Sequence, residues 1–386
     1  MILNDLKKRI GRNLINLPGW HTSRKIVVIE SDDWGSIRMS SKEVYYALLK
    51  AGVPVDKDPY SKFDALASEE DLINLFEVLE SVKDKNGNSA VITANCVVAN
   101  PNFEKIENSA FSEYHYEPFT KTLKKYPNHQ KSFELWMQGI KNKVFFPQLH
   151  GREHVNVQLW MQALKNNDVF IREAFKHQVF GVPTKLQYGA RGNYMAAFDL
   201  RAPKYLKVIE SILNDACKLF EKIFGYNSLS FIAPCYIWSE EVEKVLSENG
   251  VKSLQGIRLQ SIPLEDSVGY YKKSNYTGKG NNFKQIYTVR NAVFEPSPYQ
   301  ERNTEATILE CLKGIERAFR WGKPAIISAH RINFIGYLNE KNRDINLNSL
   351  KKLLNEITKL WPDVEFLNSS TLVSEIIDSN KSFIAK

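Results

Sequence analysis

The chain has 386 residues, of which 43% are hydrophobic and 25% are charged, as in a soluble globular protein with a large core. Its formal net charge is +8, but Lys and Arg alternate with Asp and Glu and form no basic block, so we expect no nucleic-acid partner. The four cysteines are far apart, which excludes a CxxC zinc ribbon and a disulfide scaffold.

The first 23 residues predict an N-terminal helical extension. In "MILNDLKKRIGRNLINL" the apolar residues recur at helical spacing with charges between them, and the segment lacks the apolar stretch of a signal peptide. No apolar run approaches the about 20 residues of a membrane span. We therefore expect a cytoplasmic protein without a transmembrane segment. Nothing in the sequence sets its oligomeric state.

Short apolar runs alternate with helical patterns along the rest of the chain, which predicts parallel strands joined by helices. The predicted strands cover residues 25–31, 89–98, 144–149, 228–234, 251–256, 285–290, 325–330 and 364–369. Several are apolar on both faces, as strands covered by helices should be. This pattern favours a single α/β domain over residues 1–386, a distorted (β/α)7-8 barrel; an open doubly wound sheet is the alternative.

Two segments interrupt this alternation. Residues 100–143 are aromatic and polar and are predicted to be an insertion before the third strand. Residues 257–303 are predicted to be rich in loops, and "VGYYKKSNYTGKGNN" (268–282) within them lacks the strand and helix context of a phosphate-binding loop.

Two adjacent aspartates, Asp32 and Asp33, end the first predicted strand, "IVVIESDDWGS". Neighbouring residues on a strand point to opposite faces, but a turn at the strand end can direct both carboxylates to one site. Like charges this close repel each other unless a cation lies near them. A structural turn or helix cap is an equally good interpretation of this stretch taken alone.

The segment "HGREH" places His150 and His154 four residues apart after the third strand. In a helical turn this spacing puts both imidazoles on one face, where a divalent ion can bind both. Two histidines and one carboxylate leave coordination positions open for water and substrate, which is typical of catalytic metal sites.

His330 ends the predicted strand "AIISAH", where it is suited to act as a general acid, although strand-end histidines are often structural. In a β/α barrel the carboxyl ends of the strands form one rim, and reactive groups gather there. The two aspartates and the three histidines fall on this predicted rim.

The succession "SDDWG", "HGREH", "FIAPCYIWS" and "IISAH" resembles the ordered motifs of the polysaccharide deacetylases, the NodB-homology carbohydrate esterases, over about residues 24–370. The resemblance implies a distorted β/α barrel that removes N- or O-linked acetyl groups from a carbohydrate. It implies that Asp32 is the catalytic base and His330 the acid. It further implies that Asp33, His150 and His154 bind a divalent metal, with zinc expected and cobalt, nickel, manganese or iron also suitable.

The chain departs from the family pattern in its third motif, where Ile232 stands in place of an arginine that supports the base. Arg191 or Arg331 is a candidate replacement and a candidate substrate-binding residue. Trp34, Tyr236 and Trp238 are candidates for stacking on sugar rings, and core packing is an equally good interpretation of Trp238. A backbone N–H near Cys235 or Tyr236 is the candidate oxyanion donor.

The missing arginine motivates one alternative, a carbohydrate-binding barrel that has lost turnover. The paired carboxylates motivate another, a metal-free glycosidase.

Overall fold

The computed structural model describes residue 13 and residues 16–184, 192–199, 205–265, 269–297 and 304–384. Of the predicted N-terminal helix, residues 1–12, 14 and 15 lie outside this part, and residues 16–23 form turns and extended chain. No helix in the described part is long and apolar enough to cross a membrane.

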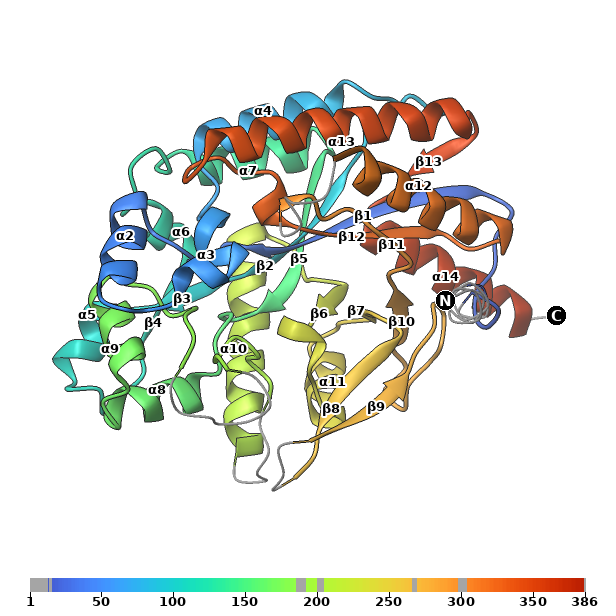
Figure 1. Cartoon of the computed structure of the whole chain (residues 1–386). Helices are drawn as coiled ribbons and strands as arrows, with labels where there is room; N and C mark the ends of the chain where they lie inside the picture. Colours follow the sequence, from blue (N-terminus) through green and yellow to red (C-terminus); the bar gives the residue numbers. More distant parts are fainter. Residues whose placement is uncertain are drawn as a thin grey trace, which may run out of the picture.

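A curled parallel sheet organises the chain (Figure 1). Its strands, in spatial order, are β10 (Ile286–Val289), β7 (Ser253–Gly256), β6 (Ser230–Ile232), β5 (Phe145–Gly151), β2 (Ile92–Val97), β1 (Lys25–Trp34), β12 (Ala325–His330) and β11 (Ala292–Val293), and β13 (Val364–Phe366) pairs with the start of β1. Each of these pairings is parallel. The predicted strands therefore all occur, within a few residues of their expected bounds.

The two edges of this sheet belong to one segment of chain. Only Arg290 and Asn291 separate β10 from β11. The Arg290 N–H donates to Gly256 O beside β10 at 2.9 Å, and the Asn291 N–H donates to Ile326 O on β12 at 3.0 Å. The segment thus bridges both edges and closes the sheet as a distorted barrel. The predicted barrel is confirmed, and the open doubly wound sheet is wrong.

Helices surround the curled sheet (Figure 1). They are α2 (Lys42–Lys50), α3 (Pro59–Phe63), α4 (Glu69–Glu80), α5 (Phe103–Asn108), α6 (Phe119–Leu123), α7 (Ser132–Lys141), α8 (Val157–Lys165), α9 (Val169–Lys176), α10 (Leu206–Phe224), α11 (Glu240–Glu248), α12 (Thr304–Arg320), α13 (Glu340–Leu360) and α14 (Ser369–Ile384). Helix α13 packs along α4 and α12, and α10 packs against α11. The apolar faces of the helices pack against the sheet and form one large hydrophobic core. Strand β1 lies in the middle of it and is buried over nearly its whole length.

Both interruptions of the strand and helix pattern contain regular structure. Residues 100–143 hold α5, α6 and α7 and most of an antiparallel pair, β3 (Ala99–Pro101) and β4 (Tyr116–Pro118). Residues 257–303 hold a second antiparallel pair, β8 (Leu259–Pro263) and β9 (Tyr270–Ser274), as well as β10 and β11. Strand β9 lies in the stretch predicted to be a loop. Its side chains are mostly exposed, so it lacks the apolar alternation that marks a half-buried strand.

Candidate metal centre and active site

The end of β1 turns two neighbouring carboxylates toward one cavity. The register between β1 and β2 shifts between Ser31 and Trp34, and Asp33 has a left-handed backbone conformation with φ +75°. A bulge of this kind changes the direction of side chains that would otherwise alternate between faces. As a result Asp32 and Asp33 both line the cavity.

His150 and His154 reach the same cavity by a bend rather than by the helical turn that their spacing suggested. Strand β5 ends at Gly151, whose φ is +126°, and residues 152–156 form bends. Between the histidines, Arg152 donates to Glu153 through Nε at 2.7 Å and Nη2 at 2.9 Å. These two buried residues hold the bend, and the two imidazole centroids lie 5.0 Å apart.

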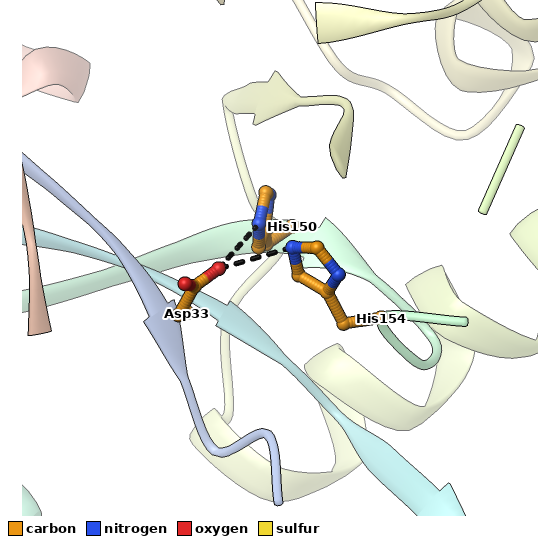
Figure 2. Close-up of side chains that lie close together, drawn as sticks. All are labelled: Asp33, His150 and His154. Atoms are coloured by element: carbon orange, nitrogen blue, oxygen red, sulfur yellow. Dashed lines mark ion pairs between the residues drawn. The ribbon is translucent and has the colours of Figure 1, made fainter. Parts of the chain in front are cut away.

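Asp33, His150 and His154 converge at buried ligand atoms (Figure 2). Asp33 Oδ1 lies 3.0 Å from His154 Nε2 and 3.5 Å from His150 Nε2, and the three potential ligand atoms all lie within 4.8 Å of one another. The other carboxylate oxygen, Asp33 Oδ2, accepts from Arg38 Nη2 at 2.8 Å. Burial raises the pKa of Asp33, but the nearby positive charges, Arg38 first, outweigh it and hold the pKa well below its usual value.

The hydrogen bonds of the two imidazoles fit a metal site. His150 Nδ1 lies 2.9 Å from Ile232 O, which can only accept a proton, so Nδ1 donates and Nε2 is the ring nitrogen available to bind a cation. That Nε2 is buried without a hydrogen-bond partner and faces Asp33 Oδ1, also an acceptor. Burial lowers the pKa of His154 to about 4, which keeps this ring neutral. A carboxylate oxygen and two ring nitrogens directed at one buried point fit a cation.

Asp32 lies beside this group and is held by Arg290, which follows β10. Arg290 donates from Nη2 to Asp32 Oδ1 at 2.6 Å and from Nη1 to Oδ2 at 2.7 Å, while Asn95 Nδ2 donates to Oδ1 at 2.8 Å. Arg290 Nε also donates to Glu30 at 2.8 Å. Burial raises the pKa of Asp32, but Arg290 outweighs it and lowers the pKa to about 2. Asp32 is therefore ionised at neutral pH.

His330 faces Asp32 across the cavity, with 3.8 Å between His330 Nε2 and Asp32 Oδ2. Its Nδ1 lies 2.5 Å from Glu295 Oε1, and Asn333 Nδ2 donates to the other oxygen of Glu295 at 2.7 Å. Burial lowers the pKa of His330, but Glu295 outweighs it and raises the pKa to about 9. The ring is therefore protonated at neutral pH, as a general acid must be.

The cavity that joins these groups has a volume of about 390 Å³, and both Cys235 and Tyr236 line it. The backbone N–H of Tyr236 donates to Ala233 O at 3.0 Å, and the oxyanion donor near Cys235 or Tyr236 stays a prediction. The Tyr236 hydroxyl lies 3.0 Å from Arg290 Nη1. These contacts place Tyr236 in the wall beside the candidate base.

Three predicted substrate-binding residues do not line the cavity. Trp34 is fully buried against Trp136 and Phe145, and Trp238 is buried with its Nε1 donating to Glu243 at 3.0 Å. Their large apolar rings are buried among other side chains rather than exposed to a substrate.

Arg331 is the third of these residues, and it is fully buried. It donates through Nε and Nη2 to both carboxylate oxygens of Asp64 at 3.0 Å. It is therefore not the arginine that supports Asp32. Arg191, the other candidate, lies outside the described residues.

Arg290 and Glu295 are the polar residues that the sequence interpretation missed. Both lie in the segment predicted to be rich in loops: Arg290 directly follows β10, and Glu295 lies two residues after the end of β11. The signal was present in "YTVRNAVFEP", where a charged residue ends an apolar run and a second follows a short apolar stretch. Arg290 makes the contact with Asp32 that the sequence interpretation expected from an arginine in the third motif.

The fold and the site together define an α/β barrel with an Asp-His-His donor set at the carboxyl ends of its strands. No family model matches this chain, and no curated protein matches it in sequence. Comparison with solved structures finds polysaccharide deacetylases and CE4 family proteins.

Three of these structures show the range of the similarity. A Mycobacterium smegmatis protein assigned by inference as a polysaccharide deacetylase is 11% identical, with 94% of each chain covered and a TM-score of 0.46. The peptidoglycan deacetylase PdaC from Bacillus subtilis is 9% identical, with 94% of this chain and 96% of that chain covered and a TM-score of 0.37. A CE4 family pseudoenzyme from Bacillus anthracis is 9% identical, with 92% and 66% covered and a TM-score of 0.38.

Proposed function

We propose that this chain is a metal-dependent hydrolase that removes N- or O-linked acetyl groups from a carbohydrate. The observation that carries the proposal is the convergence of Asp33, His150 and His154 in one cavity with an ionised Asp32 and a protonated His330. The two histidines and the carboxylate would hold the ion, and zinc suits this donor set best.

Amide and ester hydrolysis needs an activated water, a stabilised acyl oxygen and a proton for the leaving group. A bound divalent cation supplies Lewis-acid polarisation of the carbonyl and of the attacking water. In this proposal Asp32 accepts the water proton at Oδ2, the oxygen that faces His330. His330 then gives the proton on Nε2 to the leaving nitrogen or oxygen, while Glu295 holds Nδ1 and keeps the ring oriented.

Arg290 removes the reason for proposing a barrel without turnover. That alternative rests on the absence of an arginine at position 232, and Arg290 makes the bidentate contact with Asp32 from another strand. A metal-free glycosidase built on the Asp32 and Asp33 pair is also disfavoured, because Arg290 lowers the pKa of Asp32 and Arg38 lowers that of Asp33, so neither carboxyl group keeps a proton for a leaving sugar.

The proposal is tested by acetate release from a panel of acetylated chito-oligosaccharides and acetylated sugar esters. Purified protein is stripped with a chelator and then reloaded separately with zinc, cobalt, nickel, manganese or iron. We expect acetate release that disappears on stripping and returns with at least one ion. Absence of release from the whole panel, or new reducing ends without acetate, would contradict the proposed reaction.

A further inference from the structure

One wall of the cavity is built by side chains that the proposed reaction does not use. Four residues of the cavity lining form this wall: Arg38, Asp58, Tyr60 and Asn193. Arg38 follows β1, Asp58 and Tyr60 lie at the start of α3, and Asn193 lies between α9 and α10. The Arg38 guanidinium lies over the Tyr60 ring at 5.2 Å from its centroid, and Tyr60 also contacts His330 edge to face. This wall, which we call the Arg38 wall, therefore adjoins both the metal site and the acid.

Arg38 has a donor that faces the cavity without a partner. Its Nη2 donates to Asp33 at 2.8 Å, and its Nε lies 3.5 Å from Asp64 as an ion pair without a hydrogen bond. Its Nη1 makes no hydrogen bond with any residue in the described part of the chain, although the side chain is only 9% exposed. Gly181 also lines the cavity, and a Cβ atom added to it would lie 3.5 Å from Arg38 Nη1. The nitrogen therefore lies next to another residue of the cavity lining.

The hydrogen bonds of the neighbouring polar side chains leave one further donor of this wall without a partner in the described part of the chain. Asp58 accepts from Tyr60 N at 3.2 Å and from Ser61 N and Ser61 Oγ at 3.1 and 2.9 Å. Asn193 Oδ1 accepts from Met195 N at 3.2 Å, whereas its amide nitrogen has no hydrogen bond to a described residue. The wall thus presents two donors without partners among the described residues, Arg38 Nη1 and Asn193 Nδ2, beside one carboxylate, Asp58, that already accepts three hydrogen bonds.

We propose that the Arg38 wall binds an anionic oxygen substituent, a carboxylate or a phosphate, carried by the acetylated sugar. This inference rests on the proposed function and names its substrate class. An oxyanion only accepts, which matches the unpartnered donors Arg38 Nη1 and Asn193 Nδ2, whereas a hydroxyl group must also donate its own proton to an acceptor. Charged donors bind carboxylate and phosphate oxygens most strongly, and the planar guanidinium matches their geometry.

The charges around Arg38 favour the same ligand. Asp33 balances Arg38 in the absence of a metal, but a divalent ion on Asp33 Oδ1 would share that negative charge. An anionic substituent at Nη1 would then be a second anionic partner for Arg38 beside Asp64, whose carboxylate lies 3.5 Å from Arg38 Nε.

The test is the affinity of metal-loaded protein for sugars that lack an acetyl group, measured by calorimetry. The probes are glucose, glucuronate, glucose 1-phosphate and glucose 6-phosphate. We expect at least one anionic probe to bind at least about tenfold tighter than glucose. The carboxylate and phosphate probes show which anion the wall prefers. Because none of the probes can be deacetylated, a failed acetate-release assay does not affect this result.

Three variants locate the anion. Arg38→Gln and Asn193→Leu should each reduce the preference for the anionic probe severalfold, and only the first of them alters a contact to Asp33. The control Lys62→Gln, which removes an exposed positive charge on α3, should keep the preference. Equal affinity for glucose and all anionic probes would overturn the proposal. So would a preference that survives in both wall variants but disappears on metal removal, since the metal would then bind the anion.

Discussion

Asp32 and Asp33 are adjacent in sequence, equally buried and part of one cavity, yet the protein surrounds them differently. The two oxygens of Asp32 accept three donors from Arg290 and Asn95. Asp33 has one oxygen on Arg38 and directs the other at two imidazole nitrogens, one of which has no hydrogen-bond partner. Both oxygens of Asp32 are therefore hydrogen-bonded by residues of the chain. In the group of Asp33, His150 and His154, His150 Nε2 is buried without a hydrogen-bond partner among the residues that the structure describes.

This difference fits the two separate functions proposed for the neighbouring carboxylates. A carboxylate with a fixed bidentate arginine keeps its charge and orientation, as a base must. A buried carboxylate beside two imidazoles has ligand atoms directed at a common point, as a metal site must. The residues that hold each group come from different strands, so each side can be changed separately.

The largest expected effect is on turnover, when the base is removed without disturbing the metal side. Asp32→Asn keeps the size of the side chain and loses its proton affinity, so we expect kcat to fall about a thousandfold. Acetate release at saturating substrate measures it. A fall of less than tenfold would show that another group takes the proton.

Next in size is the loss of the charge that holds Asp32. Arg290→Met leaves Glu30 and Asp32 buried without their cation, and removal of one partner of a buried ion pair costs about 3 to 5 kcal/mol in the free energy of unfolding. Chemical denaturation measures this loss. The exposed pair Arg320 and Glu316 gives the control, because Arg320→Met should change stability by less than about 1 kcal/mol. Equal losses in the two variants would mean that Arg290 is not buried with its partners.

The smallest effect is a shift in the pH profile from the acid. Because the folded pKa of His330 is raised to about 9, its protonated form adds stability that is fully present below pH 6.5 and is lost as the pH rises through about 9. Activity should decline over the same alkaline range, because the acid loses its proton. In Glu295→Gln this alkaline limb should move to lower pH, and a limb that stays in place would contradict the contact between Glu295 and His330.

The sequence predicted the barrel because its strands are short apolar runs that alternate with helices, and this local pattern does not depend on distant partners. It also predicted the site residues that end those strands, since the carboxyl ends of parallel strands share one rim. Asp32, Asp33, His150, His154 and His330 all lie on the cavity.

The partners of these groups could not be predicted in the same way. Arg290 contacts Asp32 across 258 positions of sequence, and only the closure of the sheet brings them together. Trp34 and Trp238 follow strands as the site residues do, but their rings turn into the core. Local sequence shows that a side chain lies near a strand end, but the direction in which it points depends on packing with distant segments.

The metal content of purified protein tests the central claim most directly. We expect wild-type protein and Asp32→Asn each to bind one divalent ion per chain by elemental analysis. Asp33→Ala and His150→Ala should lose it while remaining folded by circular dichroism. The same metal content in all four proteins, or none in the wild type after incubation with each candidate ion, would contradict a metal centre at Asp33, His150 and His154.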